Sequence, residues 1–236
     1  MLYKSNNLVS VFLPLRKGSK RIKNKNIKSL PKLKKGLTEL KLSQLRKLKN
    51  IFSKNFKKNK IEFIVSTNCN KVKEYTSKFK WLKVYNRKES LSGDNSLDKL
   101  IQHVPNICLG KYILWTHVTS PFFNEYDYIN FIKLFFKKKN KKNKSAFSAE
   151  KLKKFIFNEK RGWVSHNYQK KKWPRTQDLQ QCYSVNSAAF IAPREIYLKN
   201  KDRICKNPIP IISRDDSGFD VDDMQDFNNL KKKLKK

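Results

Sequence analysis

A basic loop after the first apolar segment contains side chains suited to binding phosphate. Residues 8–13 are an apolar run, and residues 13–26 then bring together two arginines, several lysines, Gly18 and Ser19. Gly18 would let the backbone approach a ligand, Ser19 and free N–H groups would donate hydrogen bonds, and the cations would neutralise phosphate oxygens. The spacing fits neither Gly-x-x-x-x-Gly-Lys-Ser/Thr nor the three-glycine dinucleotide motif, so we predict a polyphosphate site of another kind.

A pair of carboxylates near the end of the chain could bind a metal ion. Asp220 and Asp222 belong to residues 215–226, the one acidic cluster in a basic chain. On a strand end, alternation would point both carboxylates the same way. Mg²⁺ is often held by one or two protein carboxylates together with substrate phosphates. The residues alone leave two interpretations equally open, a magnesium pair or acidic residues that cap a following C-terminal helix.

Two more candidates stand directly after predicted strands. Arg16 follows the first apolar run, and arginine is scarce here, accounting for nine of the 55 Lys and Arg residues. His117 follows residues 112–115 and could act as a general base, although a lone histidine at a strand end more often makes hydrogen bonds in a pocket. For any one lysine of the basic loop, a solvated surface position explains its presence as well as a binding role does.

Apolar patterning predicts strands that alternate with helices, which is typical of a mostly parallel sheet flanked by helices. Ligands of such sheets bind beyond the carboxyl ends of the strands, so the loops there should converge on one crevice. We expect strands over residues 8–13, 61–66, 82–85 and 112–115, and helices over residues 37–57, 70–78, 96–104 and 125–137. The converging loops would be residues 14–26, 66–70, 86–95 and 116–121.

The second half of the chain changes character after about residue 150. Residues 150–195 contain short aromatic and polar runs without a helical period, which suggest a small antiparallel excursion. The Lys/Asn-rich stretch at 137–144 would be a solvated helix end or a loop. Because the chain has 236 residues, 38% of them hydrophobic, and no internal repeat, we expect one α/β domain over residues 1–236 that contains this excursion.

The composition is strongly basic, with a formal net charge of +36. Such a charge can indicate binding to nucleic acid or to an anionic membrane. Lys, Asn and Ile are all abundant, however, as A/T-rich codons would produce, and a nucleic-acid surface more often uses arginine. The compositional explanation is favoured, while lysine runs at 137–144, 170–172 and 231–236 leave polyanion binding as an alternative.

Neither a membrane span nor a secretory leader is expected. No segment approaches the ~18–20 apolar residues that span a bilayer. The apolar run 8–13 after Lys4 is too short for a signal peptide. The four cysteines and three histidines are scattered, which predicts neither a zinc site nor a disulfide framework and favours a cytoplasmic protein.

Several segments, in the correct order, give the chain a resemblance to the acylneuraminate cytidylyltransferase (CMP-sialic acid synthetase) family. The basic loop resembles the family's Pro-Ala-Arg-Gly-Gly-Ser-Lys…Asn-Lys-Asn signature, and Asp220-Val221-Asp222 resembles the start of its Asp-Ile-Asp-x-x-x-Asp-Phe motif. Each match is weak alone, but five or six in register, from about residue 9 to 228, are specific. The other matching segments are 65–68, 87–94, 119–121, 175–179 and 183–188.

The resemblance implies a Rossmann-like nucleotidyltransferase fold of the GT-A-like kind. It also implies that CTP and an α-keto sugar acid, either a sialic-type nonulosonic or an octulosonic acid, give a CMP-sugar and pyrophosphate with Mg²⁺. Such a transfer depends mostly on positioning and charge neutralisation. By the family pattern, Arg16, Lys25, Asp220 and Asp222 would be catalytic, with the two aspartates holding the metal. CTP would contact Leu15, Arg16, Gly18, Ser19, Lys20, Asn24, Ser66 and Arg87.

The same resemblance implies a homodimer. Residues 150–190 would make the dimer contact and reach towards the partner's site. The sugar acid would contact His117, Thr119, Ser120, Arg175 and Gln177.

Some positions depart from the family pattern. His117 replaces a glutamine associated with the sugar, which would indicate a divergent substrate. Lys17 puts a bulky side chain where the backbone should approach phosphate, Asn68 replaces Asp and Ser187 replaces Gly. Two alternatives therefore accompany the sugar-acid hypothesis: a catalytically degenerate nucleotidyltransferase fold that binds polyanions, and a nucleotidyltransferase for another sugar. The latter usually opens with a Gly-Gly loop, which this chain lacks.

Overall fold

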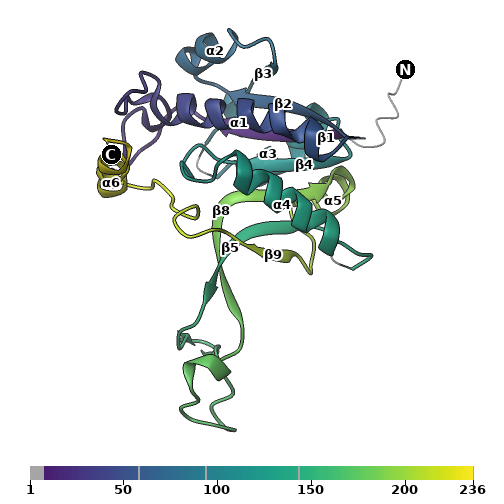
Figure 1. Ribbon diagram of the computed structural model, residues 1–236, viewed down its shortest axis with the longest axis vertical. Helices are drawn as coiled ribbons and strands as arrows, with labels where there is room; N and C mark the ends of the chain where they lie inside the picture. The colour runs from purple at the N-terminus through teal and green to yellow at the C-terminus, as the bar shows by residue number, and fades with distance from the viewer. Residues whose placement is uncertain (1–7, 58, 94, 143, 236) are drawn as a thin grey trace.

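A seven-stranded sheet forms the centre of the molecule (Figure 1). The computed structural model describes residues 8–57, 59–93, 95–142 and 144–235, so Asp94 of the segment 87–94 lies outside the described residues. The strand order is β3-β2-β1-β4-β8-β5-β9. Their bounds are β1 (Leu8–Leu15), β2 (Lys60–Thr67), β3 (Leu82–Asn86), β4 (Tyr112–Thr116), β5 (Ala146–Leu152), β8 (Cys182–Pro193) and β9 (Ile209–Ile212).

The sheet is mostly parallel, as predicted. β1 pairs in parallel with β2 and β4, and β2 pairs in parallel with β3. β8 is antiparallel to both of its neighbours, β4 and β5, whereas β5 and β9 are parallel. Because β1, β2, β3 and β4 run in one direction, their carboxyl ends meet at a single edge, where ligands of such sheets bind.

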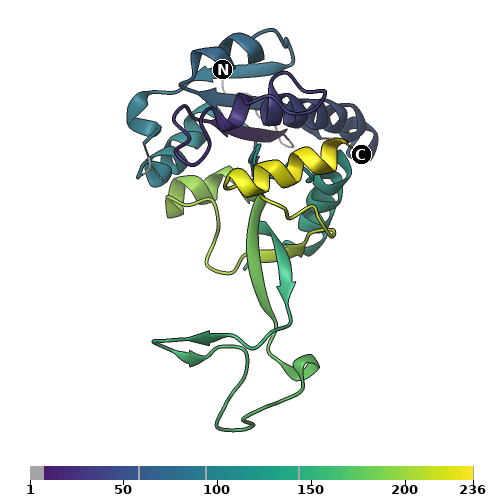
Figure 2. The ribbon, with the colours of Figure 1, turned by 90° about the vertical axis from the view of Figure 1, so that its left-hand side faces the viewer.

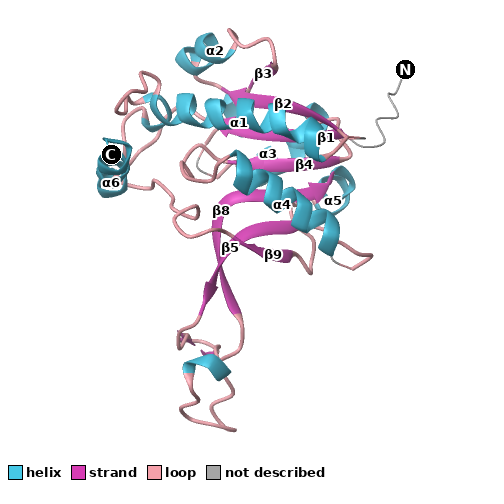
Figure 3. Ribbon diagram, in the orientation of Figure 1, coloured by secondary structure: helices cyan, strands magenta, loops and turns pink. Residues whose placement is uncertain are grey.

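Helices cover both faces of the sheet (Figure 3). α1 (Gly36–Asn55) and α4 (Glu125–Lys138) pack together on one face, and α3 (Leu97–Ile107) and α5 (Arg194–Asn200) pack together on the other. The alternation of β4 shows why both faces need cover: Leu114 belongs to the core under α1 and α4, while Trp115 belongs to the core under α3 and α5. α2 (Asn70–Thr76) lies near the β3 edge.

The edge at which the parallel strands end is crossed by the last helix, α6 (Met224–Lys235), as Figure 2 shows. This confirms the C-terminal helix expected after the acidic cluster. Residues 220–222 themselves form no strand, so the strand-end arrangement considered for the two carboxylates is wrong. Among the described helices, none has the length and apolar character needed to cross a membrane.

A long arm projects from the lower part of the sheet (Figures 1 and 2). β5 and β8 leave the sheet as an antiparallel ribbon, and the tip carries β6 (Phe157–Asn158), β7 (Gly162–Trp163) and the short helix η3 (Thr176–Asp178). The predicted antiparallel excursion is therefore present but shorter than 150–195. Residues 188–192 lie in β8 within the central sheet, because this apolar run is buried between the two helical layers.

Candidate active site

The basic loop begins where β1 ends and is held by side chains from neighbouring segments. Gly18 has φ +84°, a conformation that L side chains rarely adopt. The backbone N–H of Lys17 donates to Asn68 Oδ1 at 2.8 Å, and Asn26 Nδ2 donates to the carbonyl of Arg16 at 3.1 Å. The Lys17 side chain is exposed, so its bulk does not fill the loop.

A first cavity of about 380 Å³ opens beside this loop at the carboxyl edge of the sheet. Cations from the loop face it together with one acidic residue from the chain before α6. This combination suits a polyphosphate and a metal ion, because cations and a carboxylate-held metal share the neutralisation of the phosphate oxygens. Its lining residues are Pro14, Arg16, Ser19, Lys20, Arg21, Lys25, Asn26, His117, Val118, Thr119 and Asp222.

A second cavity of about 250 Å³ adjoins the first and shares Pro14, Arg16 and His117 with it. Its walls are more apolar, with one buried arginine, and it is lined in addition by Arg87, Gly93, Ser96, Leu97, Leu100 and Trp115. An apolar pocket with few polar groups suits a planar base or a sugar ring. Arg16 and His117 therefore stand at the junction of the two cavities.

Arg87 is only 4% exposed and is anchored to β2. Its Nη2 donates to the carbonyl of Ser66 at 2.8 Å, and its backbone N–H donates to the carbonyl of Thr67 at 2.8 Å. Burial, with Arg16 nearby, lowers the pKa of Arg87 to about 10, so the guanidinium stays charged at neutral pH. Its buried Nε has no hydrogen-bond partner within the described chain and is available to a carbonyl oxygen of a ligand.

His117 is held in one tautomer by the preceding strand. Trp115 Nε1–H donates to His117 Nε2 at 2.9 Å. Indole nitrogen only donates, so Nε2 of the histidine accepts and the proton sits on Nδ1. Burial lowers the pKa of His117 to about 3, with Arg203, Lys41 and Lys25 acting in the same direction. His117 is therefore neutral and offers a donor, which argues against the general-base role.

The carboxylate pair is attached to the rest of the site through the backbone of Val221. The N–H of Val221 donates to the carbonyl of Thr119 at 2.8 Å, and Lys25 Nζ donates to the carbonyl of Val221 at 2.8 Å. Burial raises the pKa of the Asp220 carboxyl and lowers that of Lys25. Asp222 pairs with Arg21 at 3.2 Å, but both side chains are well exposed, so this pair contributes at most about 1 kcal/mol.

The helix-capping interpretation applies to other acids of the cluster. Asp223 Oδ1 accepts from the backbone N–H groups of Gln225 and Asp226, and Asp226 Oδ2 accepts from the N–H groups of Asp222 and Asp223. This reciprocal pattern caps α6 with Asp223 and Asp226. The side chain of Asp222 lines the first cavity, and the carboxylate of Asp220 takes no part in this capping.

The family model described as cytidylyltransferase matches residues 11–202 of the chain. The protein belongs to the cytidylyltransferase family. Membership indicates a CTP-dependent nucleotidyltransferase, in agreement with a polyphosphate cavity beside an apolar one. The matched residues include the basic loop and Arg87 but end before Asp220 and Asp222.

Solved structures of other proteins have the same fold as this cytidylyltransferase. A 4-diphosphocytidyl-2C-methyl-D-erythritol synthase from Anaerococcus prevotii is 12% identical with a TM-score of 0.66, over 98% of this chain and 97% of that chain. A CMP:2-keto-3-deoxy-manno-octonic acid synthetase complexed with CTP is 11% identical with a TM-score of 0.63, over 96% and 98%.

A cytidylyltransferase from Leptospira borgpetersenii is 16% identical with a TM-score of 0.56, over 94% of this chain and 84% of that chain. At such identities the likeness concerns the fold alone, and it confirms the nucleotidyltransferase-like architecture. No curated protein matches the chain. The narrower acylneuraminate assignment stays a prediction.

The residues of the cytidylyltransferase fit a magnesium ion held by two carboxylates and substrate. Asp220 Oδ1 is buried without a hydrogen-bond partner among the described residues, as expected for an oxygen reserved for a ligand. Within the same described ranges, no group of three His, Cys, Asp or Glu side chains converges to hold a metal alone. The remaining ligands would have to be phosphate oxygens and water.

The two cavities bring together part of the predicted site residues, namely Arg16, Ser19, Lys20, Lys25, Arg87, His117, Thr119 and Asp222. Gly18 precedes Ser19 and Asp220 stands two residues before Asp222, but neither lines either of these cavities. The other predicted residues fall into two groups. Leu15 and Ser66 are buried at the ends of β1 and β2, Ser120 is buried behind Thr119, and Asn24 adopts a left-handed turn before the short helix η1 (Lys25–Ile27). Arg175 and Gln177 lie at the tip of the arm, far from their own chain's cavities (Figure 1).

Several lining residues of the cytidylyltransferase were not among the predicted contacts. Arg21 and Asn26 belong to the basic loop and its Asn-Lys-Asn motif, so the motif itself was the signal for them. Trp115, Leu97 and Leu100 line the second cavity from a strand and a helix. Their apolar character marks them only as core residues, and nothing in the local pattern distinguishes a pocket wall from a core position.

Proposed function

We propose that the enzyme activates an α-keto sugar acid with CTP, giving a CMP-sugar and pyrophosphate. The observation that carries this proposal is the pair of adjoining cavities that meet at Arg16 and His117, one cationic and one apolar, with Asp222 in the lining of the cationic one. A triphosphate, a nucleoside and an acidic sugar each find matching chemistry there. The fold and the family support CTP as the nucleotide.

In this proposal the triphosphate lies along the basic loop. Arg16, Lys20 and Lys25 neutralise its oxygens and Ser19 donates a hydrogen bond, while Asp220 and Asp222 hold Mg²⁺. When bound, the metal would offset negative charge on the phosphates and orient them. Lys25 is well placed to contact the phosphates beside the metal, because its Nζ already donates to the carbonyl of Val221, between the two aspartates.

The nucleoside would occupy the second cavity. Arg87 Nε, buried and unsatisfied among the described residues, can donate to the carbonyl oxygen of cytosine. Arg87 Nη2 is held on the Ser66 carbonyl, which keeps the guanidinium from rotating. A fixed donor aimed at a ligand carbonyl discriminates more sharply than a mobile one, because little entropy is lost on binding.

The sugar acid would lie at the junction of the cavities. His117 can donate from Nδ1, and Thr119 lines the same cavity. The anomeric hydroxyl would attack the α-phosphorus: a new O–P bond forms, the bond to the bridging oxygen of the β-phosphate breaks, the hydroxyl proton passes to water, and pyrophosphate leaves. The nearby cations offset the charge that develops on the departing pyrophosphate. Positioning and charge neutralisation supply the catalysis, with no covalent enzyme intermediate.

A homodimer completes the proposal. Arg175 and Gln177 lie too far along the arm to reach their own cavities, so a sugar contact from them requires a second copy of the chain. The tip of the arm is rich in exposed aromatic side chains, as interfaces between subunits are. These include Phe157, Trp173, Tyr168 and Tyr183.

The decisive experiment measures pyrophosphate release with all four nucleoside triphosphates against a panel of acceptors. The panel contains sialic-type nonulosonic acids, octulosonic acids and 2C-methyl-D-erythritol 4-phosphate. We expect turnover with CTP and one class of keto-sugar acid, dependent on Mg²⁺. Turnover only with the erythritol phosphate, or with a nucleotide other than CTP, would contradict the proposal.

The matched variants are Asp222→Asn and Asp216→Asn. Asp222→Asn should lower turnover by about 100-fold or more, because it removes a charge from the metal pair. Asp216 belongs to the same acidic cluster but pairs with Lys233 on the surface and has φ +64°, which asparagine tolerates. Its substitution should leave turnover within about twofold. Equal losses in both variants would count against the metal role of Asp222.

A further inference from the structure

The inner face of α1 contains two polar side chains among apolar ones. Leu37, Leu45 and Leu48 pack in the core, as the helical period requires, but Lys41 is 0% exposed and Gln44 only 8% exposed on the same face. A buried ammonium is costly unless several hydrogen-bond acceptors surround it. The hydrogen-bond partners of Lys41 and Gln44 therefore indicate what these two side chains do in the core.

Both side chains hold the backbone of the loop between β4 and α4. Lys41 Nζ donates to the carbonyls of Ser120 and Phe123, each at 2.9 Å. Gln44 Nε2 donates to the carbonyl of Pro121, which lies between them, at 2.6 Å. Three backbone carbonyls within four residues are thus fixed by one turn of α1.

A third contact of Lys41 connects α1 with α4 and, through it, with β4 and β8 of the sheet. Its Nζ donates to the hydroxyl of Tyr128 at 3.1 Å, and that hydroxyl lies 2.5 Å from Thr116 Oγ1. Thr116 Oγ1 donates to the carbonyl of Ala188 at 2.9 Å. The hydroxyl proton of Thr116 is donated to the Ala188 carbonyl, so Thr116 Oγ1 can only accept from Tyr128. The Tyr128 hydroxyl therefore donates to Thr116 and accepts from Lys41, and the three hydrogen bonds run in one direction from Lys41 to Ala188.

The loop held by Lys41 is the one that positions the carboxylate pair. Thr119 directly precedes Ser120, and its carbonyl accepts the N–H of Val221, the residue between Asp220 and Asp222. A shift of the Ser120 carbonyl would move Thr119 and, through this bond, both aspartates. Buried side chains on α1 are therefore connected to the proposed metal site by two consecutive backbone segments.

We propose that Lys41 is a positioning residue: with Gln44 it holds the loop 119–123, and through the Thr119–Val221 hydrogen bond it sets the place of Asp220 and Asp222. Lys41 does not touch the substrate in this proposal. Its catalytic consequence rests on the function proposed above, whereas its effect on the loop does not.

Lys41 Nζ needs its charged form to donate three hydrogen bonds, because a neutral amine has only two N–H groups. Burial lowers the pKa of Lys41 to about 7, and the carboxylates of Asp127 and Glu125 act in the opposite direction. Tyr128, on the same helix as these acids, has its pKa raised by burial and stays a neutral hydroxyl. A side chain that were only filling space would be replaced at no loss by a methionine of similar length.

The test compares Lys41→Met with Leu48→Ala. Both alter the buried face of α1, but the Leu48 side chain is apolar and donates no hydrogen bond to the carbonyls of the loop 119–123. Amide hydrogen exchange is followed at Val221 and across residues 119–123, with global unfolding measured separately by urea titration. In Lys41→Met we expect exchange at Val221 to accelerate by at least about tenfold, while Leu48→Ala changes it only as global stability requires.

Kinetics supply a second readout. Lys41→Met should lower kcat by about tenfold or more with KM for CTP changed by less than about threefold, because the carboxylates and not the nucleotide contacts are displaced. Gln44→Glu, which keeps the side-chain length but loses the amide donor to Pro121, should show a smaller effect of the same kind. If Lys41→Met folds poorly, this variant still tests the loop.

The outcomes separate the two proposals. Unchanged exchange at Val221 in both loop variants, or exchange no faster than in Leu48→Ala, would overturn the positioning role whatever the substrate. Accelerated exchange with unchanged kcat in an active enzyme would overturn its catalytic consequence. If the wild-type enzyme turns over no sugar acid of the panel, the proposed function is wrong, and the exchange result still tests whether Lys41 holds the loop.

Discussion

At the scale of single residues, the neutral state of His117 bears on the proposed contact with the sugar acid. Its Nε2 accepts from Trp115 and its Nδ1 carries the only proton. The ring therefore presents a hydrogen-bond donor at the junction of the two cavities and no charge. A neutral donor suits a sugar hydroxyl or carbonyl better than it suits the phosphates, which the surrounding arginines and lysines already neutralise.

His117→Gln should keep substantial activity, because glutamine also offers a donor and is the residue that the acylneuraminate family has at this position. His117→Phe fills the space without a donor and should raise KM for the sugar acid by about tenfold, with KM for CTP little changed. Steady-state kinetics with each substrate varied in turn measure this. Equal effects on both KM values would contradict a sugar contact.

The same residue predicts a pH dependence of stability. The pKa of His117 is lowered to about 3 in the folded protein, against about 6.5 in the unfolded chain. Between these values the unfolded state binds a proton that the folded state does not, so the free energy of unfolding falls as pH drops through this window. Urea titrations from pH 7 to pH 4 should show a steeper loss in wild type than in His117→Gln. Parallel curves would mean that His117 is not held neutral.

At the scale of elements, the turn after β2 holds the basic loop through the side chain of Asn68. Asn68 Oδ1 accepts the N–H of Lys17, and Asn68 Nδ2 donates to Glu89 Oε2 at 2.9 Å. One side chain thus ties the loop after β1 to the turn that precedes the second cavity. This contact also explains how the loop accepts Lys17 where the family has glycine: its backbone N–H points at Asn68 and its side chain points to solvent.

Asn68→Ala should therefore loosen the loop and raise KM for CTP by about fivefold, the value of one hydrogen bond, with a smaller change in kcat. Asn68→Asp keeps the acceptor for Lys17 but loses the donor to Glu89, so it is combined with Glu89→Gln, which supplies a donor in return. This combined variant should stay within about twofold of wild type and acts as the rescue variant. Isothermal titration calorimetry with a non-hydrolysable CTP analogue measures the dissociation constant of the nucleotide directly. A combined variant as weak as the Ala variant would show that the acceptor is not what matters.

If the arm of one subunit completes the cavity of its partner, two inactive variants should restore activity when they pair. Arg175→Ala damages an arm and Asp222→Asn damages a cavity, so each homodimer should be inactive. Co-expression of the two variants with different tags gives mixed dimers in which one cavity and the arm that serves it are both intact. Random pairing should restore about a quarter of wild-type turnover per chain. No activity in purified mixed dimers would place Arg175 outside the partner's site.

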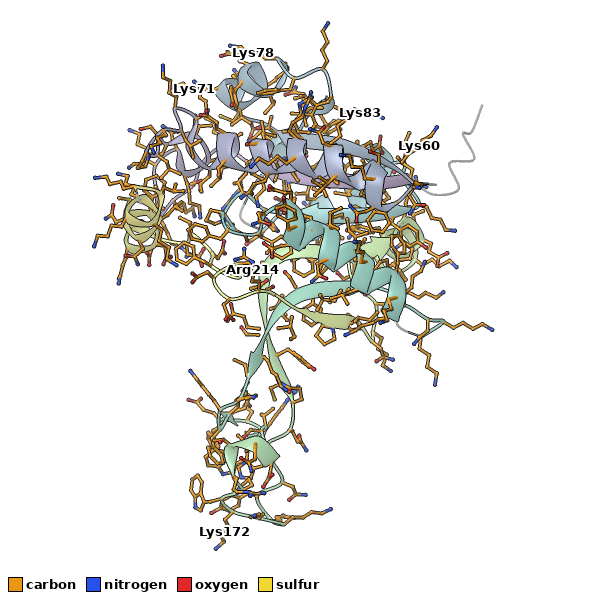
Figure 4. The ribbon with its side chains drawn as sticks, in the orientation of Figure 1. Lys60, Lys71, Lys78, Lys83, Lys172 and Arg214 are labelled. Carbon is orange, nitrogen blue, oxygen red and sulfur yellow. The ribbon has the colours of Figure 1, made fainter. Side chains whose placement is uncertain are left out.

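At the scale of the whole molecule, the net charge of +36 is spread over the surface. Figure 4 shows Lys60, Lys71, Lys78, Lys83 and Lys172 projecting from the start of β2, from α2 and its surroundings, and from the tip of the arm. The first four lie at the β2–α2–β3 end of the molecule and Lys172 lies at the opposite end, so these lysines form no single patch. Such a distribution agrees with a compositional origin of the lysines better than with a built surface for nucleic acid.

We therefore expect binding to single-stranded DNA and to anionic vesicles to be weak and to disappear at physiological salt. Fluorescence anisotropy and vesicle co-sedimentation at about 50 mM and about 200 mM salt measure this, with CTP turnover recorded under the same conditions. Tight binding that survives the higher salt, in a protein without pyrophosphate release, would favour the degenerate polyanion-binding alternative.

The sequence by itself determined the elements and the chemistry of the loop. Apolar runs of period two and stripes of helical period follow from burial on one or both faces, so β1 to β4 and α1, α3 and α4 could be predicted within a few residues. The basic loop, Arg16 and the family were also legible, because their signals lie within short segments. The place of β8 between β4 and β5 could not be predicted. Its apolar run resembles any buried strand, and which strands pair with it depends on residues far away in the sequence.

Only the tertiary structure decided which polar residues act together. Asp220 and Asp222 could equally have capped α6 until Asp223 and Asp226 were found to do so. Lys41 was one lysine among many until its three acceptors, about 80 residues away in the chain, surrounded it. A hydrogen bond between distant segments depends on strand order and register, and no local pattern of residue types encodes either.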